Sequence, residues 1–109
     1  MKTLNKVQLV GYLGKDPVLT VAKNGAKRIQ LRVATDHYYK DEKGKTQRVV
    51  TWHDVVAWDK IAEKVENQFI KGSHVMVEGE LQYRSFSDDQ GNIRHVTQIK
   101  ANLILNLDR

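Results

Sequence analysis

The sequence predicts an all-β domain with one helix, in which five major strands close a small Greek-key barrel. Runs of alternating apolar and polar residues recur along the chain and are separated by glycine-containing turns. A single segment, residues 59–71, has helical rather than alternating spacing. A glycine also stands inside the first apolar run, where a barrel needs a bulge or a sharp bend.

The first quarter of the chain predicts two strands and a turn. Residues 7–13 form an apolar-rich run that contains Gly11. The sequence GKDP at residues 14–17 ends this run, and residues 18–22 form a short second one. Asn24-Gly25 then predicts a hairpin turn of type I′, in which both central residues have positive φ.

The middle of the chain predicts the next two major strands. Residues 28–34 alternate strictly, and Arg28 and Arg32 lie on the polar side, so this strand is expected to be half-buried with one cationic face. Residues 37–47 break the alternation and predict either a long mobile loop or an extended hairpin. Residues 48–57 are rich in β-branched residues and predict a strand, but both of its faces are mixed.

The helix is expected over residues 59–71. Apolar side chains recur there at helical spacing, Asp59 stands at the N-cap position, and Gly72 follows as a stop signal. A helix between the third and fourth major strands of a small closed sheet is the arrangement of an OB-fold barrel, a fold that binds oligonucleotides.

The last two strands follow the helix and are joined by a turn at residues 88–92. In the first of them, alternation places apolar residues on one side: Val75, Val77, Leu81 and Tyr83. The other side is mostly polar and carries Glu80, Gln82 and Arg84, and Phe86 lies on this polar side. The inward side of the final strand is expected to consist of Ile99, Ala101, Leu103 and Leu105.

Size and composition favour one domain with a polyanionic partner. The chain has 109 residues, of which 40% are hydrophobic, so we assign residues 1–109 to a single domain. The net charge of +5 favours a polyanion, although an ordinary basic protein can carry the same charge. The absence of cysteine excludes disulfides and thiol catalysis. No signal peptide or membrane-spanning run is visible, so a cytoplasmic location is expected.

Aromatic and basic residues occur together in a way that suits single-stranded nucleic acid. Bases stack on flat rings whatever their sequence, and cations neutralise phosphates. The candidate rings are Tyr39, Trp52, Trp58 and Phe86. The candidate cations are Lys6, Arg28, Arg32, Lys40, Lys43, Lys45, Arg48, Lys60 and Arg84. For any single ring, the alternative is partial burial or a contact within an oligomer.

The sequence indicates no catalytic or cofactor chemistry. The four histidines include no pair at helical metal-binding spacing, so no metal is expected. Glu78 and Glu80 lie on one side of a strand, but nothing marks a pocket around them. No phosphate-binding glycine loop is present, and no cofactor is expected. His53 is expected to be a structural or oligomer-interface residue.

Three segments resemble the bacterial single-stranded-DNA-binding proteins. They read NKVQLVGYLGKDP at residues 5–17, TWHDVVAWDKIAE at residues 51–63 and KGSHVMVEGEL at residues 71–81. Their order and spacing cover nearly the whole chain. The resemblance implies an OB-fold that assembles as a homotetramer of two dimers. It also implies sequence-tolerant binding and protection of single-stranded DNA in replication, recombination and repair.

The resemblance assigns base stacking to the four candidate rings, and it alone favours Tyr39 over Tyr38. The family often has tryptophan where this chain has Tyr39 and Phe86, and phenylalanine where it has Trp58, so each exchange keeps a ring. Asp54 is a larger departure, because the family commonly has arginine there. This exchange puts one phosphate contact in doubt.

Family members usually continue beyond this domain with a disordered linker and an acidic tip that recruits replication and repair proteins. This chain ends at Arg109, which leaves a trimmed domain and a natural short variant as alternatives. Two other functions are open: a primosome-type accessory protein of the same fold, acting as a dimer through protein contacts, and a small OB-fold subunit whose rings pack on a partner protein. The complete set of rings argues against the accessory protein, and quenching of tryptophan fluorescence by an oligonucleotide would separate strand binding from the OB-fold subunit.

Overall fold

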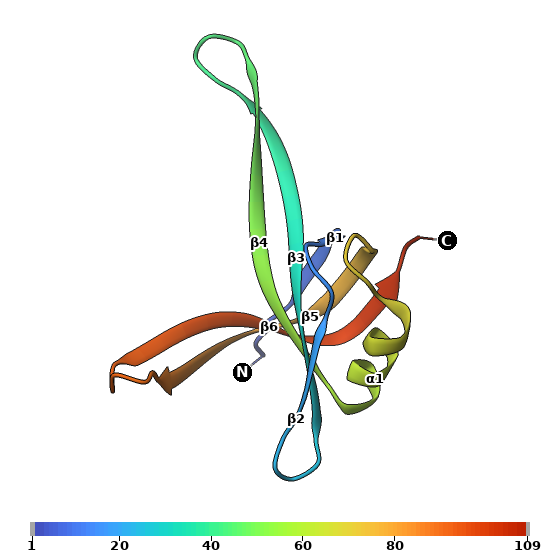
Figure 1. The fold of residues 1–109 in the computed structure, drawn as a ribbon. Coiled ribbons are helices and arrows are strands. Elements are labelled where there is room, and N and C mark those ends of the chain that lie inside the picture. Colours follow the sequence, from blue (N-terminus) through green and yellow to red (C-terminus); the bar gives the residue numbers. More distant parts are fainter. Residues whose placement is uncertain (1, 109) are drawn as a thin grey trace.

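The computed structural model describes residues 2–108 and places one helix among strands that follow the predicted order (Figure 1). The elements are β1 (Val7–Leu13), β2 (Val18–Val21), β3 (Lys27–Lys40), β4 (Thr46–Trp58), α1 (Asp59–Gln68), β5 (His74–Ser87) and β6 (Ile93–Asn106).

The sheet closes on itself through five of its strands. They follow the order β1-β5-β6-β4-β3, and β1 pairs back onto β3. The β4–β6 pair is parallel and all others are antiparallel. β2 adds only to the outer edge of β3. With α1 between the third and fourth closing strands, the topology confirms the predicted OB-fold barrel.

The core fills the barrel and the space under α1. Inward residues of the strands, such as Leu31, Val55 and Val77, are almost completely buried. The apolar side of α1 adds Ala62 and Val65 to the same cluster. The helix packs against β3, β4 and β6, and so it covers one side of the barrel.

The helix boundaries differ from those predicted. Asp59 is not the N-cap: it is the first helical residue, with a φ of 52°, and its carboxylate accepts the backbone N–H of Lys27 at 3.2 Å. The N-cap is Trp58, which makes no capping hydrogen bond through its side chain. The helix ends at Gln68, before the predicted Lys71, and Gly72 with a φ of 88° belongs to the following turn.

The turn at Asn24-Gly25 is a hairpin turn, but it is not of type I′. Gly25 has a φ of 87°, whereas Asn24 does not have a positive φ. The N–H of Gly25 donates to the carbonyl oxygen of Ala22 at 2.9 Å, and the N–H of Ala22 donates to the carbonyl oxygen of Ala26 at 2.8 Å. These bonds enclose a three-residue loop whose only left-handed residue is the glycine, which is the next most common hairpin connection.

Of the two alternatives for residues 37–47, the extended hairpin is correct. The β3–β4 pairing runs without interruption from Arg28 opposite Trp58 to Lys40 opposite Thr46. The outer part of this hairpin projects far from the barrel (Figure 1). At its tip, the carboxylate of Asp41 accepts the N–H groups of Lys43 and Lys45 and so fixes the turn.

The bulge expected at Gly11 lies elsewhere. Pairing of β1 with β5 is regular through Gly11, and a Cβ on this residue would lie 2.1 Å from the carbonyl oxygen of Ala34. The glycine therefore permits close approach where β1 passes from β5 to β3. The register shift falls between Glu78 and Gly79, at the pairing with β6.

This register shift overturns part of the predicted inward side of β6. Glu78 lies opposite Leu103 and Gly79 opposite Ala101, so one β6 residue is left out of the pairing. A one-residue shift exchanges the two sides of a strand. Ile104 is consequently buried, whereas Leu103 and Leu105 are exposed. Tyr83 was also expected on the apolar side, but it is 79% exposed because the outer ends of β5 and β6 leave the barrel as a second hairpin.

Candidate nucleic-acid interface

One side of the β3–β4 pair carries most of the candidate residues. Residues directly opposite each other on antiparallel strands share a face. The outer face, called the ladder face below, combines these residues: Arg28, Gln30, Arg32, Ala34, Asp36, Tyr38 and Lys40 of β3 with Thr46, Arg48, Val50, Trp52, Asp54, Val56 and Trp58 of β4. The other face supplies Leu31, Val33 and Val55 to the core.

The β5–β6 hairpin extends the ladder face sideways. Lys100 of β6 lies beside Val56 in the parallel β4–β6 pair, and its partner on β5 is Glu80. Arg84 and Phe86 lie on the same side of β5 as Glu80. The expectation that Phe86 shares the polar side of its strand is therefore confirmed. Two hairpins thus meet and form one continuous outer surface.

Each of three candidate rings lies next to an arginine. The guanidinium carbon of Arg28 is 6.0 Å from the centre of the Trp58 ring. The corresponding distances are 5.5 Å from Arg32 to Trp52 and 5.5 Å from Arg84 to Phe86. Trp52, Trp58 and Phe86 are 49%, 36% and 42% exposed. These half-exposed rings leave area for a flat ligand and have a cation beside each.

The structure settles the side of β4 on which Trp52 lies, which alternation did not decide. Trp52 is on the ladder face, and a Cβ on Gly14 would come within 2.2 Å of its ring, so the glycine makes room for the indole. His53 points to the other side, where its Nε2 is 2.9 Å from the Oγ1 of Thr35. His53 is thus hydrogen-bonded within the chain, and its interface role stays a prediction.

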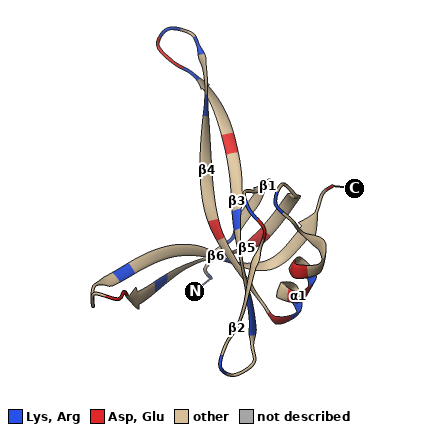
Figure 2. Ribbon diagram, in the orientation of Figure 1, with Lys and Arg blue, Asp and Glu red and all other residues tan. Residues whose placement is uncertain are grey.

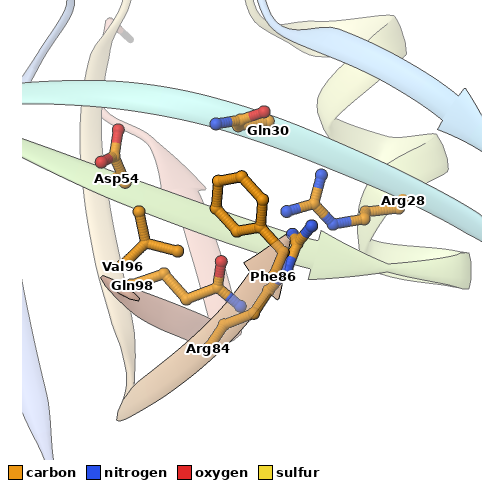
Figure 3. A pocket seen from close by; sticks show the side chains of 7 residues that line it. All are labelled: Arg28, Gln30, Asp54, Arg84, Phe86, Val96 and Gln98. Atoms are coloured by element: carbon orange, nitrogen blue, oxygen red, sulfur yellow. The ribbon is translucent and has the colours of Figure 1, made fainter. Parts of the chain in front are cut away.

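A hollow of about 290 Å³ surrounds Phe86 where the two hairpins meet (Figure 3). Its lining residues are Arg28, Gln30, Asp54, Arg84, Phe86, Val96 and Gln98. Within residues 2–108, neither Arg28 nor Arg84 forms an ion pair with a carboxylate. Burial, and then the neighbouring charge of Arg84, lower the pKa of Arg28 from its ordinary value. Two uncompensated cations thus stand beside an exposed ring.

The remaining candidate cations are spread over the molecule (Figure 2). Lys40, Lys43 and Lys45 lie at the far end of the β3–β4 hairpin and are exposed. Lys60 is exposed at the start of α1. Lys6 is not brought to the ladder face, because it pairs with Glu78 of β5 at 3.6 Å beside β1.

Arg48 lies on the ladder face but is already engaged by a carboxylate. Its Nε donates to the Oδ2 of Asp36 at 2.9 Å. That hydrogen bond, more than the accompanying charge, raises the pKa of Arg48. Any phosphate contact by Arg48 therefore competes with Asp36.

The regular hairpin also distinguishes Tyr38 from Tyr39. Tyr38 lies opposite Arg48 on the ladder face and is 63% exposed. Tyr39 lies on the other face, where its ring centre is 6.2 Å from that of His37. Alternation in the sequence could not assign Tyr38 or Tyr39 to a face, because the segment shows no regular period, and which of the two rings stacks stays a prediction. Only the unbroken register of the hairpin assigns each of them to a face.

The described part of the chain, residues 2–108, contains no group of three histidine, cysteine or acidic residues placed to hold a metal ion. No helix within this range has the length and apolar composition needed to cross a membrane.

Comparison with known proteins matches residues 4–107 to the family model described as the single-strand binding protein family. A protein of Xylella fastidiosa named single-stranded DNA-binding protein 1 is 39% identical over 102 residues, which are 93% of this chain and 75% of that protein. A protein of the same name from Chlorobaculum tepidum is 38% identical over 97 residues, which are 88% of this chain and 60% of that protein.

Two solved structures have the same fold. A Plasmodium falciparum SSB in complex with ssDNA superposes with a TM-score of 0.89 at 25% identity, covering 99% of this chain and 98% of that one. A deletion mutant of the single-stranded DNA binding protein from Thermus aquaticus gives a TM-score of 0.83 at 30% identity. That match covers 96% of this chain and 51% of the Thermus chain, so this chain spans about half of its length.

Proposed function

Because the chain belongs to the single-strand binding protein family, we propose that it binds and protects single-stranded DNA with little sequence preference, during replication, recombination and repair. The observation that carries the proposal is the continuous outer surface with three half-exposed rings, each beside an arginine. The place of action is then the exposed strands of a bacterial nucleoid in the cytoplasm.

The mechanism follows from the two kinds of group on this surface. Bases stack on Trp52, Trp58 and Phe86, and each stacked base contributes about 1–3 kcal/mol whatever its identity. The arginines beside the rings neutralise phosphates. Tyr38 lies on the same ladder face and extends the line of rings along the hairpin. Tyr39, favoured by the family resemblance, would be contacted only by a strand that passes over the other face of the hairpin.

Titration with a thymine homopolymer, followed by tryptophan fluorescence, tests the proposal. Stacking on Trp52 and Trp58 is expected to quench the emission strongly at low salt. The affinity should fall with salt with a log–log slope of about −0.7 per phosphate neutralised. Replacing Arg28 and Arg84 together by glutamine should make this slope shallower, whereas Lys6→Gln, away from the ladder face, should leave it unchanged. Absence of quenching at low salt would contradict the proposal and favour an accessory protein acting through protein contacts.

We also propose assembly as a homotetramer of two dimers, which an apolar surface away from the ladder face supports. Val10, Met76 and Leu105 lie side by side on the outer face of β1, β5 and β6. Val10 and its neighbour Tyr12 are 53% and 55% exposed. β1 pairs with β3 only at Tyr12 and Leu13, so the rest of that edge offers unpaired backbone groups to a second copy.

Molar mass in solution tests the assembly. The expected value is four times the chain mass of 12.5 kDa. Val10→Asp should reduce it, because a carboxylate would be buried in the apolar contact. Val21→Asp, at an exposed position on β2, should have no effect. A monomeric parent chain, or equal effects of the two variants, would contradict this assignment of the interface.

A further inference from the structure

The hollow around Phe86 has charges of opposite sign on its two sides. The guanidinium groups of Arg28 and Arg84 lie near each other on one side of the ring, and the carboxylate of Asp54 lies on the other (Figure 3). A nucleotide has a matching asymmetry, because its phosphate is negative whereas its base offers both donors and acceptors. The hollow thus distinguishes the two ends of a nucleotide.

Asp54 keeps accepting capacity that the protein does not use. Among residues 2–108 its only ion pair is with Arg32, and the Nη1–Oδ1 distance of 3.6 Å exceeds that of a short charge-assisted hydrogen bond. No other hydrogen bond to its carboxylate is formed within the described residues. The side chain is 38% exposed, so an incoming donor can reach it.

We propose that Asp54 reads the edge of a base stacked on Phe86 and gives the protein a preference for bases with an exocyclic amino group, cytosine above thymine. In this arrangement Arg28 and Arg84 hold the phosphate on the opposite side of the ring. This inference rests on the proposed binding of single-stranded DNA, to which it adds a limited base preference.

The preference follows from the chemistry of the carboxylate. An ionised carboxylate only accepts hydrogen bonds. Cytosine offers the amino group at N4, which aspartate and glutamate accept from in protein–DNA contacts. Thymine has an oxygen at the same position, and its single N3–H lies between two carbonyl oxygens that a carboxylate repels. Gln30 and Gln98 also line the hollow, but an amide both donates and accepts and so serves either base.

Asp54 also restricts how a strand can lie. A carboxylate repels phosphate, so the backbone is expected to pass over Arg28 and Arg84 while the base edge points towards Asp54. Asp54 therefore offers a contact to the base and none to phosphate. The expected consequence is a weaker electrostatic contribution at this position for every sequence.

Equilibrium binding of deoxycytidine and deoxythymidine homopolymers of equal length tests this inference. The measured quantity is the ratio of the two affinities, compared between the parent chain and its variants, because differences in stacking and strand flexibility then cancel. Asp54→Ala and Asp54→Asn should each lower the cytosine-to-thymine ratio by at least about threefold, which is less than the factor of more than about ten for an enclosed hydrogen bond to a charged group because Asp54 is partly exposed to water. The asparagine variant should also bring the two affinities together, since its amide accepts from cytosine N4 but donates to thymine O4 as well.

Asp36→Asn is the matched control. Asp36 is another aspartate on the ladder face, it pairs with an arginine, and its side chain is 40% exposed. This variant should leave the ratio unchanged, because Asp36 does not line the hollow. A ratio that Asp54→Ala and Asp54→Asn leave within twofold of the parent value overturns the base preference. Failure of the parent chain to bind either homopolymer would instead overturn the proposed function itself.

Discussion

Replacing Trp52 by alanine is expected to weaken binding of single-stranded DNA by about 5- to 150-fold and to leave the barrel folded. The factor corresponds to the loss of about 1–3 kcal/mol of base stacking. About half of the indole is exposed on the ladder face, and Arg32 and Gly14 hold it in place. Fluorescence anisotropy of a labelled oligonucleotide measures the affinity, and thermal unfolding measures the stability.

Two further variants make the Trp52 result specific. Trp52→Phe keeps a ring and should recover most of the affinity, since each base stacks on any aromatic face. Tyr83→Ala removes an even more exposed ring from a residue that does not line the Phe86 hollow, and it should leave the affinity unchanged. A large fall in the melting temperature of Trp52→Ala would place the indole in the structural core instead.

The sequence predicts this fold well wherever a strand is half-buried, because the alternation within that one strand is then enough to assign its two faces. Strict alternation in residues 28–34 is matched by burial of Ile29, Leu31 and Val33. The prediction fails at Leu103 and Leu105, because the register shift at Gly79 depends on how β5 meets β6. Alternation within one strand contains no information about an extra residue in its pairing.

The site is predictable to a similar degree, and for a similar reason. Alternation placed Phe86 on the outer side of β5, because that side is otherwise polar. It did not place Trp52, since both sides of β4 are mixed, and it did not place Tyr38, since the register of the β3–β4 hairpin had to be known. In the sequence, Asp54 stands out only as a departure from the arginine that the resembled family commonly has. Its position across Phe86 from Arg28 exists only after barrel closure.

The register of the long hairpin leads to a second strong effect, at Tyr38. Tyr38→Ala should weaken binding of a long oligonucleotide by about tenfold, the lower part of the range for one stacked base. Tyr38 is four residues beyond Ala34, the partner of Trp52, so at about 3.3 Å per residue its ring lies roughly 13 Å farther along the ladder face. An oligonucleotide too short to span this distance should bind the parent chain and the Tyr38→Ala variant equally.

Tyr39→Ala is the decisive comparison, because the two tyrosines are neighbours on one strand and differ mainly in the face they occupy. A strand that follows the ladder face contacts Tyr38 and passes Tyr39 by, so the affinity should fall less for Tyr39→Ala. The opposite order would mean that the strand crosses to the face of His37 and Tyr39, as the family resemblance implies for Tyr39. Equal losses in both variants would require DNA on both faces of the hairpin, and the strand would then wrap around its projecting end rather than lie along one side.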